Sequence, residues 1–171
     1  MSTPLSQAEQ FKGLVEWLGN AIRPPERFTL GYNAEASEFI RFNKGKVRQA
    51  GLVQQANLSL KLINDGRHGD ISLTLAGELD VDKQRLTEAL QQLRDTLPLL
   101  PADPYLLLNP QPWHSHNVQD QPLPDTARVL EEIRSASSGV DLVGFYACGP
   151  ISYRYASSEG AFGWHQANLS L

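Results

Sequence analysis

Apolar residues near the beginning of the chain recur every three or four positions, which is the spacing of one face of an α-helix. Ser6 and Glu9 are spaced as a capping box, although Thr3, which precedes a proline, is an equally good earlier start. Pro24 ends the pattern because proline donates no backbone hydrogen bond. The predicted helix carries the apolar stripe Leu5, Ala8, Phe11, Leu14, Val15, Leu18 and Ile22.

Between residues 28 and 76 apolar and polar residues alternate, which is the period of a strand with one buried face. Short turns that contain glycine separate the segments, as in antiparallel hairpins. Two of these turns, Asn43-Lys44-Gly45 and Asn64-Asp65-Gly66, consist of residues that tolerate positive φ. We therefore expect a meander of short strands at about residues 28–32, 38–42, 46–50, 58–62 and 71–75.

The second half of the chain adds two helical patterns and further strands. Asp80 or Asp82 is suited to cap a helix that ends at Pro98, with the stripe Leu86, Ala89, Leu90, Leu93 and Leu97. A proline-rich connection leads to a helix at about 124–139 with the stripe Val129, Leu130, Ile133 and Ala136. Strands are expected at 140–146, 152–156 and 161–171. The predicted class is α+β, a mostly antiparallel β-sheet covered by about three amphipathic helices.

The length of 171 residues suits one α+β domain spanning 1–171. The hexapeptide Gln-Ala-Asn-Leu-Ser-Leu occurs at 55–60 and again at 166–171. The first copy continues to a turn, whereas the second stops in mid-alternation. We expect the amino-terminal domain of a longer protein that is truncated near residue 171. A chance match of six common residues remains an open alternative for the repeat.

Charge and cysteine content narrow the classes of partner. A net charge of -4 and a pI near 5.5 disfavour nucleic-acid binding, since the summed field repels phosphates. The single cysteine, Cys148, fits a reducing compartment. Neither a signal peptide nor an apolar run long enough to span a bilayer is evident. These observations predict a cytoplasmic protein with no membrane partner.

Two combinations of residues suggest chemistry only weakly. His114 and His116, with Asp120 as a third donor, are spaced as a possible metal-ligand pair, but surface histidines are the favoured interpretation. Cys148 would be a nucleophile if His165 lay beside it, and nothing in the sequence supplies that proximity. We therefore predict no catalytic residue and no metal ligand in this chain.

Candidate binding or interface residues come from two segments. Arg41, Asn43 and Lys44 flank a basic turn that would contact an acidic partner or a peptide carboxylate, or would simply be a solvated hairpin edge. The aromatic-rich carboxy-terminal segment suggests either cross-strand packing or a recognition groove. It supplies the remaining candidates Tyr146, Arg154, Trp164 and His165.

Two groups of motifs resemble the TldD/PmbA family, whose members are also called modulators of DNA gyrase and are described as zinc-dependent peptidases. The first group resembles the opening strands and hairpins of that family, with FIRFNKGKV at 39–47 and LKLINDGR at 60–67, followed by Gly69. The second, more specific group is similar to the segment that leads towards the second domain. It comprises GFYACGP at 144–150, Arg154, ASS at 156–158, Gly160 and Trp164.

The resemblance implies how catalysis would be distributed. Catalytic members carry a His-Glu-x3-His helix and a distant cysteine in a carboxy-terminal domain, and inactive partner subunits lack that helix. None of the 4 histidines here is followed by glutamate, so no catalytic residue carries over. This chain alone is expected to be inactive, and zinc would belong to the missing carboxy-terminal domain.

The leading hypothesis is a non-catalytic amino-terminal domain of a TldD/PmbA-like metallopeptidase that contributes to the peptide-binding cleft and to subunit contacts. Its expected partners are its own carboxy-terminal domain, a family member in a homo- or heterodimer, and a peptide substrate. The alternative is a stand-alone ligand- or peptide-binding module with no link to peptidases. A direct regulator of gyrase is opposed by the acidic charge.

Overall fold

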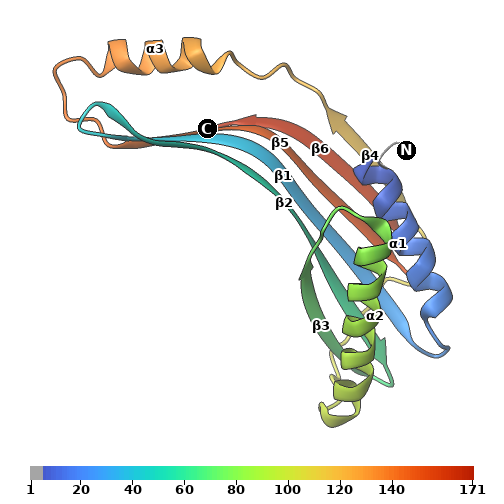
Figure 1. Cartoon of the computed structure of the whole chain (residues 1–171). Coiled ribbons are helices and arrows are strands. Elements are labelled where there is room, and N and C mark those ends of the chain that lie inside the picture. The colour runs from blue at the N-terminus through green and yellow to red at the C-terminus, as the bar shows by residue number, and fades with distance from the viewer. Residues whose placement is uncertain (1–5) are drawn as a thin grey trace. The chain divides into compact units, whose positions relative to one another are not determined.

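The computed structural model describes residues 6–171, which form an α+β structure as the sequence predicted (Figure 1). The helices are α1 Gln7–Ala21, α2 Leu79–Thr96, the short 3₁₀ helix η1 Leu97–Leu99, and α3 Thr126–Ala136. The strands are β1 Arg27–Asn43, β2 Lys46–Asn64, β3 Arg67–Thr74, β4 His114–Gln119, β5 Gly144–Ser157 and β6 Phe162–Ser170. They make one mostly antiparallel sheet in the order β3-β2-β1-β5-β6-β4.

The chain divides into two compact units, which are described separately below. Unit 1 contains the described residues up to Asn33, together with Ala56–His116 and Tyr153–Trp164. Unit 2 contains Ala34–Gln55, Asn117–Ser152 and His165–Leu171. The long strands β1, β2 and β5 contribute residues to both units. The expectation of a single domain over 1–171 stays a prediction.

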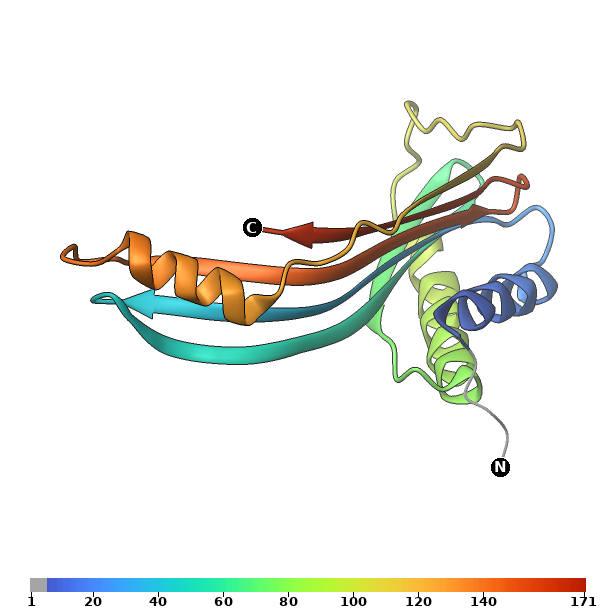
Figure 2. The same ribbon diagram turned by 90° about the horizontal axis from the view of Figure 1, so that it is seen from above.

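Unit 1 has a closed core in which α1 and α2 lie on the same side of its strands (Figure 2). The two helices also contact one another, and Gly69 of β3 lets Leu93 of α2 approach the sheet, since a Cβ there would lie 3.2 Å from Leu93 Cδ2. Each fully buried leucine contributes roughly 1.5–3 kcal/mol of hydrophobic stabilisation. The largest apolar side chains that are fully buried are Phe11, Leu14, Leu18, Leu30, Leu58, Leu60, Leu62, Leu86 and Leu90.

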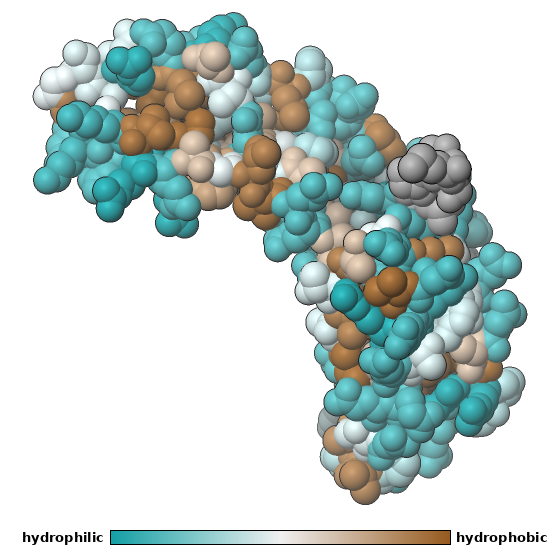
Figure 3. Space-filling model, viewed as in Figure 1, coloured by the Kyte–Doolittle hydropathy of each residue, from teal (hydrophilic) through white to brown (hydrophobic). Residues whose placement is uncertain are grey.

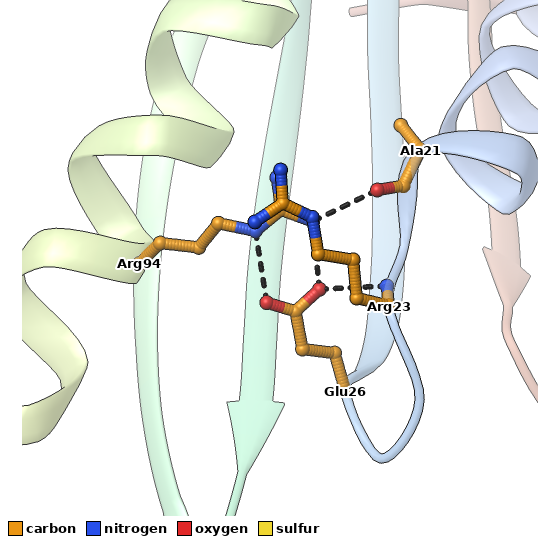
Figure 4. Close-up of polar contacts among 4 residues, drawn as sticks. All are labelled: Ala21, Arg23, Glu26 and Arg94. Atoms are coloured by element: carbon orange, nitrogen blue, oxygen red, sulfur yellow. Dashed lines mark hydrogen bonds and ion pairs between the residues drawn. The ribbon is translucent and has the colours of Figure 1, made fainter.

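A nearly buried ion pair ties α2 to the chain between α1 and β1 (Figure 4). Arg94 donates from Nε to Glu26 Oε1 at 2.8 Å and from Nη2 to Oε2 at 2.7 Å, and Nη2 also donates to Ala21 O at 2.8 Å. The Glu26 carboxylate accepts a further bond from the backbone N–H of Arg23 at 2.9 Å. The Arg94 guanidinium holds the pKa of Glu26 below its usual range.

Unit 2 has a smaller core, in which α3 covers the strands through half-buried residues. Ile40 and Phe42 of β1 and Tyr146 and Cys148 of β5 form its buried cluster, and α3 packs on them through Val129, Leu130 and Ile133. In Figure 3 apolar side chains gather between α3 and the strands beneath it. No residue of α3 is itself fully buried. This unit therefore depends on one partly exposed helix.

The helix cap of α1 and the two tight turns, which depend on residues close together in the sequence, agree with the sequence predictions. Ser6 caps α1 in a reciprocal capping box with Glu9; the alternative start at Thr3, and Leu5 of the predicted stripe, lie outside the described residues. Both predicted tight turns are present, with positive φ at Lys44, Gly45, Asp65 and Gly66. The second turn joins β2 and β3 in antiparallel register, with Asn64 opposite Arg67.

Three predictions about strand limits were wrong, and so was the predicted cap of α2. The expected strands at 28–32 and 38–42 are one strand, β1, because pairing with β2 and β5 on both sides overrides the low β-propensity of the intervening residues. For the same reason the strands expected at 46–50 and 58–62 are one strand, β2. The strands expected at 140–146 and 152–156 are also one strand, β5, which begins only at Gly144.

The prediction that Asp80 or Asp82 caps α2 was wrong, since neither side chain does so. Asp82 lies inside the helix and accepts from the N–H groups of Ala76 and Gly77, which precede it.

Candidate functional site

Half of β2 is an unpaired sheet edge. The strand runs over Lys46–Asn64, but its outer neighbour β3 pairs only with Asn57–Asn64. Because β3 is the last strand in the order of the sheet, residues 46–55 have β1 on one side and no strand of the described chain on the other. We call residues 46–55 the open edge; all of them belong to unit 2.

The direction of the backbone groups identifies which residues offer hydrogen bonds at the open edge. Leu75 N donates to Ala56 O at 2.8 Å, so the carbonyl of Ala56 points to the β3 side of β2. In an extended strand the N–H and C=O groups of alternate residues point the same way. Leu52 and Gln54 are therefore expected to present theirs at the open edge, where the Leu52 side chain is 83% exposed.

A cavity of about 270 Å³ lies beside the open edge within unit 2. Leu52 and Gln54 of β2 line it on one side, Cys148 and Pro150 of β5 on another, and Leu123 precedes α3. An extended peptide that pairs with an edge strand gains affinity from the backbone and specificity from pockets for its alternate side chains. The open edge and this cavity supply both features.

The backbones of β1 and β5 approach closely next to this cavity. A Cβ on Gly149 would lie 2.4 Å from Ala36 O and 2.5 Å from Ser37 Cα, so only glycine fits. On β1, the Glu38 carboxylate accepts a hydrogen bond from the hydroxyl of Thr126, the first residue of α3. These contacts hold β1, β5 and α3 around the cavity.

The predicted residues of the basic turn lie at one end of the open edge. Arg41 and Asn43 are exposed near the end of β1, and Lys44 occupies the turn with φ of 54°. The Arg41 guanidinium lies 5.8 Å from the centroid of the Phe39 ring. Lys46 and Arg48, on the open edge itself, are also exposed and extend the positive charge along β2.

The other predicted residues are not gathered at one site. Tyr146 is buried in the core of unit 2, and burial raises the pKa of its hydroxyl. In unit 1, the guanidinium of Arg154 lies between the rings of Tyr32 and Trp164, at 4.6 and 4.5 Å from their centroids. It is 4% exposed and donates from Nη1 to Gln7 O at 3.1 Å. Arg154 and Trp164 thus pack with one another, while His165 is exposed on β6.

A zinc site needs at least three protein ligands that lie close together. Over residues 6–171 no cluster of three or more His, Cys, Asp or Glu side chains could hold a metal ion. His114 and His116 are exposed on β4, and the His116 ring makes an edge contact with Trp164. The described residues do not fit zinc, and no zinc chemistry follows from them.

Sequence reasoning missed the residues that define the open edge and its cavity, above all Leu52, Gln54 and Leu123. One signal was present in the sequence. The alternation of apolar and polar residues after the Asn64-Asp65-Gly66 turn ends at about residue 75. In the structure β3 accordingly has 8 residues, whereas β2 has 19. A long strand with a short outer neighbour must leave part of its edge unpaired.

Comparison with solved structures shows three proteins with the same arrangement over nearly the whole chain. TldE from Thermococcus kodakarensis superposes with a TM-score of 0.69 at 14% identity, over 94% of this chain. A "putative modulator of DNA gyrase" from Bacteroides thetaiotaomicron gives 0.60 at 14% over 95%, and one from Thermotoga maritima gives 0.55 at 10% over 96%. The chain shares the fold of TldD/PmbA proteins.

The likeness to the TldD/PmbA proteins concerns the fold, given identities of 10–14%. The chain spans 37%, 38% and 39% of the lengths of the three matched chains. No protein-family model matches the sequence, and a search of curated proteins gives no match. No helix among residues 6–171 is long and apolar enough to cross a membrane.

Proposed function

We propose that this chain is a non-catalytic part of a TldD/PmbA-like protein and that it binds an extended peptide along the open edge of β2. The open edge is the observation that carries the proposal. Its backbone groups supply sequence-tolerant hydrogen bonds, and the cavity beside Leu52 accepts one side chain of the peptide. The exposed cations at the turn, including Arg41 and Lys44, favour a peptide with acidic residues.

The wider assignment rests on the fold. A domain that spans about two-fifths of its structural neighbours is suited to shape a cleft whose other wall comes from elsewhere in a larger protein. In this proposal zinc and the catalytic residues, where the protein has them, belong to a carboxy-terminal domain. A second subunit of the same family completes a dimer, and the protein works in the cytoplasm.

The peptide-binding proposal is tested with a fluorescent decapeptide of alternating Val and Glu whose carboxyl terminus is amidated. Leu52→Pro removes an N–H donor of the open edge, where proline is tolerated in strands. Leu52→Ala keeps that donor and is the matched control. We expect fluorescence anisotropy to show at least tenfold weaker binding by the proline variant than by the alanine variant.

Equal binding by the two variants would contradict pairing at the edge. The same decapeptide with every peptide N–H methylated serves as the control ligand, because it keeps the side chains but has no backbone donor left for pairing, and it is expected not to bind. Circular dichroism of both variants checks that the fold is retained.

The remaining parts of the proposal have separate tests. The gene beyond the codon of Leu171 is expected to encode a further domain, and a stop codon there would instead favour a stand-alone peptide-binding module. The isolated chain, freed of metal by a chelator, is expected not to cleave the decapeptide. Cleavage under those conditions would contradict the non-catalytic assignment.

A further inference from the structure

The cavity beside the open edge is lined by one carboxylate and no cation. Glu38 of β1 lines it, and no lysine or arginine of the described chain does. Within residues 6–171 the half-buried Glu38 forms no ion pair. Most of the remaining lining is apolar, with Leu52, Leu123 and Pro150 among it. A carboxylate beside apolar surface attracts a cation more strongly than one in open water does, because the local dielectric is lower.

One oxygen of this carboxylate is left for a ligand. Glu38 Oε1 accepts a hydrogen bond from the hydroxyl of Thr126, which is an uncharged group, and Oε2 accepts none from the described chain. Oε2 is accessible as well. It is not one of the enclosed polar atoms that lack a partner within residues 6–171, which belong to Asn64, Tyr146, Ser152, Arg154 and Trp164. The cavity therefore offers a ligand a single anionic acceptor.

The position of Glu38 in the sheet selects a long side chain. A peptide paired at the open edge has β2 between itself and β1, the strand that carries Glu38. Neighbouring strands lie about 4.8 Å apart, so the peptide backbone would be about 10 Å from that of β1. A side chain of the peptide has to cross the exposed Leu52 before it meets the carboxylate. Lysine is suited to this path, because its methylene stem packs on apolar surface while its ammonium group reaches a polar partner.

The single acceptor also distinguishes lysine from arginine. A guanidinium binds most strongly where it donates in parallel to both oxygens of a carboxylate. At Glu38 one of these oxygens is occupied by the hydroxyl of Thr126. An ammonium group is a compact charge, for which one oxygen is sufficient. The volume of about 270 Å³ is below the range of about 300–1,000 Å³ that is typical of sites for whole ligands, which fits a single side chain.

The open edge has a preference for opposite charges on the two faces of the sheet. Successive side chains of a strand point to opposite faces. Glu38 is an even number of positions from Ile40 and Phe42, which are buried beneath α3, and an odd number from the exposed Arg41. Acidic side chains that meet the basic turn therefore belong on one face of a bound peptide. The cation that Glu38 attracts belongs on the other.

We propose that the peptide bound at the open edge places a lysine in this cavity, with its ammonium group paired to Glu38 Oε2, and carries acidic residues on the opposite face. This inference rests on the proposed peptide binding and names the class of peptide that the edge selects. Glu38 is the residue that determines this specificity.

Four amidated decapeptides test the preference by fluorescence anisotropy. One alternates Val and Glu, and in the other three a central valine is replaced by lysine, norleucine or arginine. Norleucine keeps the stem of lysine but ends in a methyl group. We expect the lysine peptide to bind about tenfold more tightly than the norleucine peptide, which is the factor that a hydrogen bond to a charged group supplies, and more tightly than the arginine peptide. Equal binding of the lysine and norleucine peptides would overturn the proposal.

A fifth peptide tests the face on which the lysine lies. It has the composition of the lysine peptide, but the lysine and the glutamate before it change places. The exchange moves the lysine to the face of Arg41 and a glutamate to the face of Glu38, so the tenfold gain should disappear. Equal binding of the two isomers would overturn recognition by the cavity, because a general attraction between opposite charges does not depend on the face.

Two variants assign the preference to a named carboxylate. Glu38→Gln is expected to make the lysine and norleucine peptides bind equally, while its amide oxygen still accepts from Thr126. Glu35→Gln is the matched control, since Glu35 is also half-buried on β1 but accepts from Gln55 and does not line the cavity. It should retain the preference for lysine. A preference that survives Glu38→Gln, with the circular dichroism unchanged, would overturn the role of Glu38.

The norleucine peptide separates the failure of this inference from the failure of the proposed function. Binding of the norleucine peptide without any gain for lysine would retain pairing at the open edge and overturn the lysine site alone. Failure of every peptide to bind would overturn both.

Discussion

Units 1 and 2 use the same long strands in different ways. In unit 1, β2 is paired on both edges, α1 and α2 cover the strands, and Leu60 and Phe11 are completely buried. In unit 2, the same strand has a free edge, and α3 contains no fully buried residue. On that free edge Leu52 is 83% exposed, whereas the most exposed large apolar side chain described in unit 1, Leu107 at 94%, lies in the connection between η1 and β4.

This difference separates stability from recognition. Unit 1 pairs both edges of its part of β2 and covers the apolar face of its strands with α1 and α2, so that only the outer edge of the short strand β3 is left unpaired beside this part of β2. Unit 2 leaves the backbone donors of a long strand accessible beside a cavity, which costs stability but permits pairing with an extended chain. We therefore expect substitutions in unit 1 to affect mainly folding, and substitutions at the open edge to affect mainly binding.

The largest effect is expected for a leucine truncation in unit 1. Leu60 is 0% exposed. Replacing it by alanine should lower the free energy of unfolding by about 2–5 kcal/mol, because the substitution leaves a cavity in a closed core. Leu130→Ala, the same change on half-buried α3, should cost only about 1 kcal/mol. Urea denaturation measures both. Equal losses would contradict the contrast between the two cores.

The buried ion pair should come next. Glu26→Gln leaves Arg94 without its counterion and is expected to cost about 2–3 kcal/mol near pH 7. The lowered pKa of Glu26 means that the native state binds this proton less readily than the unfolded chain does. The stabilisation is thus complete above about pH 5 and is lost as the pH falls below about 4.

The difference in unfolding free energy between the wild type and Glu26→Gln should therefore shrink in acid. Thermal and urea unfolding between about pH 3 and pH 7, which brackets the usual pKa of a carboxylate, measures this difference in unfolding free energy. Glu16→Gln, on the exposed side of α1, is the control and should have no such dependence. A difference that stays constant with pH would show that the ion pair does not stabilise the fold.

In unit 2, a methyl group at the closest approach of two strands should destabilise the fold by about 1–3 kcal/mol. Gly149→Ala places a Cβ 2.4 Å from Ala36 O, and backbone atoms cannot move aside as a flexible side chain does. Gly144→Ala on the same strand is the control, since its nearest neighbour would be Leu142 Cδ1 at 3.7 Å. Chemical denaturation that ranks the two substitutions equally would contradict this contact.

The smallest effects are expected at the helix caps, at about 1 kcal/mol each. Ser6→Ala removes the capping box of α1, and Asp125→Ala removes the carboxylate that accepts from Ala127 N at 2.8 Å. In Ser6→Ala, amide exchange should become faster only in the first turn of α1, because the buried Phe11 anchors the rest of the helix. In Asp125→Ala, exchange should become faster along the whole of α3, which has no fully buried residue. If the faster amide exchange were confined to the first turn in both helices, the contrast between the two units would be weakened.

Local features of this fold could be predicted from the sequence, whereas the candidate site could not. The capping box at Ser6 and the turn at Lys44-Gly45 depend on residues next to one another, and both predictions were confirmed. The open edge depends on how far β3 extends along β2, and the stacking of Arg154 depends on distant aromatic residues. A single sequence carries little information about such long-range pairing, so β1 also appeared as two short strands.

Residue-resolved amide exchange of β2, with and without the amidated Val-Glu decapeptide, tests the central claim most directly, because the strand contains its own control. The peptide should protect outward-pointing amides of the open edge, Leu52 and Gln54 among them, and leave the half paired with β3, Asn57–Asn64, unchanged. Exchange at Leu52 and Gln54 that the peptide does not slow, or equal protection of both halves, would contradict the assignment of residues 46–55 as the binding edge.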